Sequence, residues 1–268
     1  MTTSNSSPNR KTALITGASV GIGYELAKLL ARDSYDLILV SRDKDRLQSV
    51  AEELEESFQG RVAVLPKDLT IARAPDEIFE QLQQNSITLD VLVNNAGFGA
   101  QGAFHAGDTQ QVLDMIQLMV TSLVHLTRLV LPGMIDRGSG KILNVASTAA
   151  FQPGPYMSIY YATKAFVLSF SEAVGTELRG TGVSVTTLCP GPTRTEFHAR
   201  AGMKESRLAS SGVVMDAQTV ARLGYEAMMK NKLTVITGAR NKLGAFLSKR
   251  VMPKSIVLRT VSALNKNR

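Results

Sequence analysis

Tryptophan is absent from this 268-residue chain, and cysteine and histidine are scarce. The single cysteine, Cys189, excludes a disulfide framework and favours a reducing compartment. The three histidines (His105, His125 and His198) lie far apart in the sequence and belong to no CxxC or HExxH motif. No metal site is therefore predicted.

Long hydrophobic runs are missing as well. No uninterrupted stretch of about 18 apolar residues could span a membrane; the nearest, at 112–131, is broken by an aspartate, a histidine and an arginine. Residues 1–10 lack the apolar segment of a signal peptide, and we expect them to form a disordered tail. These features predict a cytoplasmic protein.

Acidic residues are missing from one part of the chain only. Residues 240–268 carry eight Lys or Arg and no Asp or Glu, whereas the other 22 basic and 23 acidic side chains nearly balance. The net charge of +7 therefore belongs to this extension. The rest of the chain has no basic stripe interleaved with aromatic residues, so nucleic acid is not expected as a partner.

Short apolar runs alternate with helical patterns, which predicts βαβ units and a parallel sheet covered on both faces. We expect a single α/β domain over residues 11–239, a Rossmann-type doubly wound sheet of about seven strands. Asp216 is expected to cap a helix over 217–230. In the basic extension, apolar residues recur at helical spacing on either side of Pro253. The expected strands are Ala13–Thr16, Leu37–Val40, Val62–Leu65, Val91–Asn94, Ile142–Ala146, Val183–Leu188 and Thr234–Ile236.

A glycine-rich segment at residues 16–23 (TGASVGIG) follows the first expected strand and opens a helix. Glycines there permit a tight turn and let backbone N–H groups approach a pyrophosphate at the positive end of the helix. The spacing is GxxxGxG, and a plain strand-to-helix turn is the alternative. Its place in the first βα unit favours a dinucleotide.

The end of the second expected strand bears on which dinucleotide is bound. An acidic residue there would hold the ribose 2′-OH of NAD. In this chain Ser41 and Arg42 occupy those positions, and the acidic residue Asp43 lies one position too far along the sequence. An arginine can hold a 2′-phosphate through charge-assisted hydrogen bonds. We predict NADP(H), with NAD(H) less favoured; a solvated surface arginine is the alternative.

Tyr160 and Lys164 are four residues apart in a helical pattern, so both project from one face. A nearby ammonium favours the phenolate and would lower the tyrosine pKa from about 10, which suits a proton donor. Alone, such a pair is usually a plain surface contact. Two hydroxyls at neighbouring strand ends strengthen the interpretation: Ser147, and Thr193 in a Pro-Gly-Pro-Thr turn. Separately, these would be capping and turn hydroxyls.

Taken together, these motifs resemble the short-chain dehydrogenase/reductase family over about residues 11–238. They occur in the family's order, and the thirteen residues between Ser147 and Tyr160 match its spacing. The residues that carry the resemblance are TGASVGIG at 16–23, Asn94-Asn95-Ala96-Gly97, Ser147, Tyr160, Lys164, Pro190-Gly191 and Thr195.

The resemblance implies an NADPH-dependent reduction of an aldehyde or ketone, by transfer of the pro-S hydride to the carbonyl carbon. Ser147 would polarise the carbonyl, Tyr160 would donate the proton, and Lys164 would bind the nicotinamide ribose and lower the Tyr160 pKa. The residues that it implies for cofactor binding are Gly17, Ser19, Val20, Gly21, Ile22, Gly23, Ser41, Arg42, Asp68, Leu69, Asn94, Ala96, Gly97, Tyr160, Lys164, Pro190, Gly191, Thr193 and Thr195.

The sequence departs from the family pattern at Met119, where the family has a fourth catalytic residue, an asparagine that holds a water for proton relay. A thioether is a weak acceptor and cannot hold that water in the same way. We expect hydride transfer with slowed proton supply. A pseudoenzyme that binds NADP(H) without turnover is the alternative, and an epimerase or dehydratase on this fold is a third reading.

The expected substrate pocket indicates the class of substrate. We expect its pocket to be walled by Phe98, the segment 148–157 (with Phe151, Tyr156 and Met157) and a lid at 195–211 containing Phe197 and Met203, with Gly202 and the 210–212 segment allowing movement. A medium-sized apolar carbonyl fits, including a 3-oxoacyl or steroid-like one.

Partners other than the substrate are suggested by two regions of the chain. The apolar helices expected at 109–136 and 158–180 suggest a homodimer or homotetramer. The basic extension at 240–268 has three readings: a helix packed on the domain or on a partner subunit, a peripheral contact with anionic lipid, or recognition of an acidic carrier protein.

Overall fold

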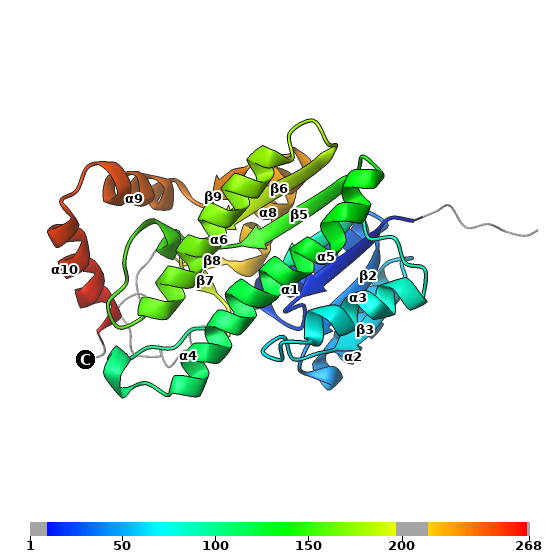
Figure 1. The fold of residues 1–268 in the computed structure, drawn as a ribbon, viewed down its shortest axis with the longest axis horizontal. Coiled ribbons are helices and arrows are strands. Elements are labelled where there is room, and N and C mark those ends of the chain that lie inside the picture. The colour runs from blue at the N-terminus through cyan, green and yellow to red at the C-terminus, as the bar shows by residue number, and fades with distance from the viewer. Residues whose placement is uncertain (1–9, 197–213, 267–268) are drawn as a thin grey trace, which may run out of the picture.

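A seven-stranded parallel sheet forms the centre of the molecule in the computed structural model, which describes residues 10–196 and 214–266 (Figure 1). The strand order is β3-β2-β1-β4-β5-β6-β9, so the order reverses between β1 and β4. This confirms the predicted Rossmann-type fold, in which ligands bind beyond the carboxyl ends of the strands at such a reversal. The strands are β1 (Thr12–Thr16), β2 (Asp36–Ser41), β3 (Val62–Pro66), β4 (Val91–Asn94), β5 (Gly140–Val145), β6 (Val183–Cys189) and β9 (Thr234–Ile236).

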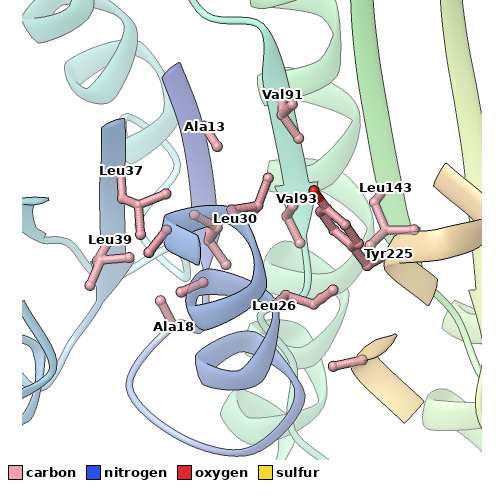
Figure 2. Close-up of a cluster of buried hydrophobic side chains, with 14 of the residues drawn as sticks. Ala13, Ala18, Leu26, Leu30, Leu37, Leu39, Val91, Val93, Leu143 and Tyr225 are labelled. Carbon is pink, nitrogen blue, oxygen red and sulfur yellow. The ribbon is translucent and has the colours of Figure 1, made fainter. Parts of the chain in front are cut away.

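Helices cover both faces of the sheet, each over its own apolar core. On one face, Leu26 and Leu30 of α1 lie against Leu37, Leu39 and Val93 of the strands (Figure 2). Most residues of the five strands inside the sheet edges are buried because helices cover both faces, which is why these strands are continuous apolar runs. The helices of this face are α1 (Gly21–Arg32), α2 (Lys44–Ser57) and α8 (Ala217–Met229), and those of the other are α3 (Ala74–Gln84), α5 (Ser122–Asp136) and α6 (Ser158–Glu177).

A long helical stretch, Thr109–Asp136, crosses the second face in three parts. These are α4 (Thr109–Ile116), a π-helical turn η2 (Gln117–Thr121) and α5. By length and composition alone the stretch could cross a membrane. In the structure, however, its residues Leu126, Val130 and Met134 belong to the core beneath the sheet, so we interpret it as a core helix.

Two short strands join the chain on either side of the predicted substrate lid. β7 (Thr193–Arg194) pairs in parallel with β8 (Met215–Asp216), and Asp216 then caps α8 by accepting a 2.6 Å hydrogen bond from the Thr219 N–H, as predicted. The lid residues Phe197, Gly202, Met203 and those at 210–212 lie outside the described residues. Two 3₁₀ turns, η1 (Phe104–Ala106) and η3 (Thr148–Phe151), complete the loops.

The basic extension forms two helices, α9 (Ala239–Arg250) and α10 (Lys254–Asn265), which meet at Pro253 as the spacing predicts. Val257 and Val261 of α10 pack against Tyr161 of α6 and Met157 just before it. The extension is therefore packed on the domain, beside the helix that carries the predicted catalytic pair.

Candidate active site

A cavity of about 990 Å³ lies at the carboxyl ends of β1 to β6, where the fold places ligands. Eighteen of the predicted site residues line it, and only Gly23 and Asn94 do not. Those lining it are Gly17, Ser19, Val20, Gly21, Ile22, Ser41, Arg42, Asp68, Leu69, Ala96, Gly97, Ser147, Tyr160, Lys164, Pro190, Gly191, Thr193 and Thr195.

The glycine-rich loop forms a close-packed cradle at one end of this cavity. Gly17 has φ +66°, and a Cβ there would lie 2.9 Å from the Cα of Ala96. A Cβ on Gly23 would lie 2.2 Å from the Gly17 carbonyl oxygen, so Gly23 serves helix packing rather than ligand contact. Asn95 holds the loop from β4, because its Nδ2 donates to the carbonyls of Thr16 and Gly17 at 3.0 Å. A pyrophosphate fits such a backbone cradle.

The end of β2 presents a cation to the cavity and no free carboxylate. Arg42 lines the cavity, is largely exposed and pairs loosely with Asp68 at 3.7 Å. Asp43, the acidic residue that follows Arg42, caps α2, because its carboxylate accepts a hydrogen bond from the Arg46 N–H at 3.1 Å. Asp36 lies at the opposite end of β2 and accepts from the Arg61 N–H. These residues fit a 2′-phosphate better than a free 2′-OH.

Ser147, Tyr160 and Lys164 come together at the other end of the cavity. Ser147 follows β5 and begins η3, where its Oγ accepts from the Ala149 N–H at 3.1 Å. The Ser147 hydroxyl also hydrogen bonds with that of Tyr160. Lys164, one turn further along α6, donates from Nζ to the Val145 carbonyl at 2.7 Å, and its Nζ lies 5.8 Å from the centre of the Tyr160 ring.

Burial controls the ionisation of both titratable groups. It raises the pKa of Tyr160 to about 12, although the hydrogen bond from Ser147 acts in the opposite direction. It lowers the pKa of Lys164 to about 8. Desolvation dominates the Tyr160 pKa in this arrangement, in which the Lys164 ammonium lies over the tyrosine ring and donates to a backbone carbonyl. The lowering of the Tyr160 pKa by Lys164 stays a prediction.

Met119 lies in the π-helical turn η2 and is buried, and a Cβ added to Gly97 would lie 3.6 Å from the Met119 sulfur. Its sulfur receives a weak 3.9 Å hydrogen bond from the Thr163 hydroxyl. A separate cavity of about 10 Å³, room for one water molecule, is bordered by Met119, Lys164 and Asn94. Asn94 donates to Asn144 at 2.9 Å, and its buried Oδ1 has no hydrogen-bond partner among the described residues.

The substrate end of the cavity differs in part from the prediction. Phe98 and Met157 line it, whereas Phe151 and Tyr156 do not. The sequence did not predict Asn95 as a lining residue, although it belongs to the quoted motif, nor a set of lining residues from α4 and the extension. These are Gln110, Gln111, Asp114, Arg240, Asn241 and Leu264. Asn241 packs against Gly191, where a Cβ would lie 2.1 Å from the Asn241 amide nitrogen.

Comparison with known proteins agrees with the fold and the arrangement of the site. The family model of short chain dehydrogenases matches residues 11–206, most of the domain. The chain belongs to the short-chain dehydrogenase family, whose members are oxidoreductases with a nicotinamide cofactor.

Particular relatives cover most of the chain. The ketoacyl reductase HetN of a Nostoc species is 31% identical over 242 residues, which are 89% of this chain and 82% of that protein. A short-chain dehydrogenase from Sphingobium yanoikuyae, solved in complex with NADPH, is 33% identical with a TM-score of 0.79, covering 88% and 92% of the two chains. A bulky-bulky ketone specific alcohol dehydrogenase from Comamonas testosteroni is 32% identical with a TM-score of 0.75, covering 88% and 91%.

Proposed function

We propose that the protein is an NADPH-dependent reductase of medium-sized apolar aldehydes or ketones. The observation that carries this proposal is the hydrogen-bonded pair Ser147 and Tyr160, with Lys164 one turn away, in a cavity that also contains a phosphate cradle. When bound, the cofactor would supply a hydride to the carbonyl carbon. The names of the relatives, a ketoacyl reductase and a bulky-ketone alcohol dehydrogenase, support this class of substrate.

The roles of the side chains follow from their contacts. A carbonyl oxygen bound between the Ser147 and Tyr160 hydroxyls would accept a hydrogen bond from each, which stabilises the negative charge that develops there. Tyr160, with its pKa raised by burial, keeps its proton until that charge appears. Lys164 would supply a donor for the nicotinamide ribose. Gly17 and its loop would hold the pyrophosphate, and Arg42 the 2′-phosphate.

Turnover of a panel of aldehydes and ketones tests the proposal, with NADPH and NADH compared. Tyr160→Phe should reduce kcat by about 100-fold or more, the usual contribution of a general acid, while the protein still binds NADPH by fluorescence titration. Arg42→Ala should raise the KM for NADPH by about 10- to 100-fold and leave that for NADH unchanged. Lys44→Ala, an exposed cation outside the cavity, is the matched control. Equal turnover by Tyr160→Phe and wild type would refute the reductase.

A second candidate, an NADP(H) sensor with impaired turnover, is favoured by one observation only, the buried thioether of Met119 beside Lys164. Met119→Asn decides between them. If slow proton supply limits the reaction, the amide should raise kcat several-fold without changing the Kd for NADPH. Met119→Leu conserves the volume and lacks the amide, so kcat should not rise in it. Tight NADPH binding with no turnover in either variant would favour the sensor.

A further inference from the structure

Large apolar side chains are exposed on the C-terminal extension. Leu243 and Phe246 of α9, Val251 and Met252 of the turn and Ile256 of α10 have exposed fractions between 37% and 59%. A soluble domain rarely exposes this many large apolar side chains on one short segment unless the segment binds a partner. Figure 1 shows α9 and α10 at the end of the molecule next to β9, away from β3. We call residues 246–256, where the two helices meet, the C-terminal tip.

Cations surround these apolar side chains. Lys249, Arg250 and Lys254 belong to the tip and are exposed. No acidic residue occurs after position 239, and within residues 10–196 and 214–266 none of the ion pairs uses a cation of the extension. The tip therefore combines exposed hydrocarbon with positive charge that the described part of the domain does not neutralise.

The extension is packed against the domain. The buried residues Val257 and Val261 hold α10 to the domain, and the Nδ2 of Asn265 donates to the Pro155 carbonyl at 3.0 Å. The exposed apolar side chains therefore lie on the outer face of the helix pair, and α10 packs on the domain through its opposite face.

From this combination we propose that the C-terminal tip binds the surface of an anionic lipid bilayer. Such a surface offers both negatively charged headgroups and a hydrocarbon layer, which match the lysines and arginines and the apolar side chains respectively. A second copy of the chain would bring the same cations against one another. An acidic carrier protein would neutralise the charge but offers no hydrocarbon layer to Val251 and Met252.

Docking also has a consequence for the reaction, and this consequence rests on the proposed function. Arg240 and Asn241 of α9 and Leu264 of α10 line the large cavity, so the helix pair that meets the bilayer also forms part of the cavity wall. An apolar carbonyl compound dissolved in the bilayer would then be concentrated at the cavity. The substrate class indicated is a membrane-partitioning ketone or aldehyde.

Co-sedimentation of the full chain with lipid vesicles tests the docking without any activity measurement. The protein should pellet with vesicles of equal parts phosphatidylcholine and phosphatidylglycerol, stay in solution with pure phosphatidylcholine, and be released by high salt. K249E/R250E/K254E should lower the partition coefficient by about 100-fold or more, since each cation near an anionic surface contributes about fivefold. V251S/M252S should weaken binding at unchanged charge.

The matched control is R179E/K230E/K232E, which reverses three exposed cations outside the extension. It should bind as wild type does, and all variants should retain the wild-type Kd for NADPH, which reports an intact fold. Wild type that stays in solution with anionic vesicles overturns the proposal, as does equal binding by the tip charge-reversal variant. Vesicle binding together with an inactive enzyme would refute only the reductase.

Discussion

The burial of Lys164 has a cost in stability, and in the proposed reaction this side chain would bind the nicotinamide ribose. It is 5% exposed, and its Nζ donates a hydrogen bond to the carbonyl of Val145. The sequence predicts that Lys164 lies on one helix face with Tyr160, and this is found. It does not predict the pKa of either group, because i,i+4 spacing says nothing about desolvation or about which carbonyl the ammonium reaches.

The lowered pKa of Lys164 predicts a pH-dependent stability. Between pH 8 and 10.5 the unfolded chain binds the lysine proton more strongly than the folded one, so this residue destabilises the fold at neutral pH and the penalty fades as pH rises. Lys164→Met should therefore stabilise the protein without cofactor at pH 7, and the gain should shrink by roughly 2 kcal/mol at pH 9.5. Urea unfolding at both pH values measures this.

Lys230→Met, at an exposed lysine, is the control and should show no such trend. A gain for Lys164→Met that is equal at both pH values would show that the buried lysine keeps its ordinary pKa.

At the scale of elements, α10 shows where prediction from the sequence stops. The apolar spacing about Pro253 predicts both helices of the extension, and continuous apolar runs predict all seven strands of the central sheet to within two residues. The surface that a helix packs on depends on residues far away in the chain. Neither the contact of α10 with α6 nor the cavity-lining role of Leu264 could be read from its own pattern.

Asn265 is the main polar attachment of α10. Its Nδ2 donates to the Pro155 carbonyl, and its Oδ1 accepts from the Tyr161 hydroxyl at 3.3 Å. Asn265→Ala removes both bonds, each worth about 1 kcal/mol, and leaves buried groups unpaired. We expect faster tryptic cleavage of the extension, because α10 opens more often. Thr260→Ala, which loses only a bond within α10, should be cleaved at the wild-type rate.

At the scale of the whole molecule, apolar side chains remain exposed on the helices of the second sheet face. Leu113 and Ile116 of α4, Ile135 of α5 and Phe166 of α6 are 37–52% exposed, and Phe166 stacks on Phe170 at 5.9 Å between ring centres. The sequence led us to expect a homodimer or homotetramer through these helices, and we retain this as a proposal.

Phe166→Glu should therefore shift the protein to a smaller species in light scattering, because an unpaired carboxylate would be buried in the interface. Ile71→Glu changes an exposed apolar residue outside these helices and should leave the molecular mass unchanged. A wild-type protein that is monomeric, or a Phe166→Glu variant with the wild-type mass, would show that the face has no subunit partner.

The contact between Gly154 and Tyr161 has a consequence for how this protein varies among its relatives. A Cβ on Gly154 would lie 2.2 Å from the Tyr161 ring, and the hydroxyl of that ring hydrogen bonds to Asn265. In a relative that replaces Tyr161, neither the glycine at position 154 nor the asparagine at position 265 would still be needed for contact with this side chain. We therefore expect positions 154, 161 and 265 to change together during evolution, independently of the neighbouring Tyr160.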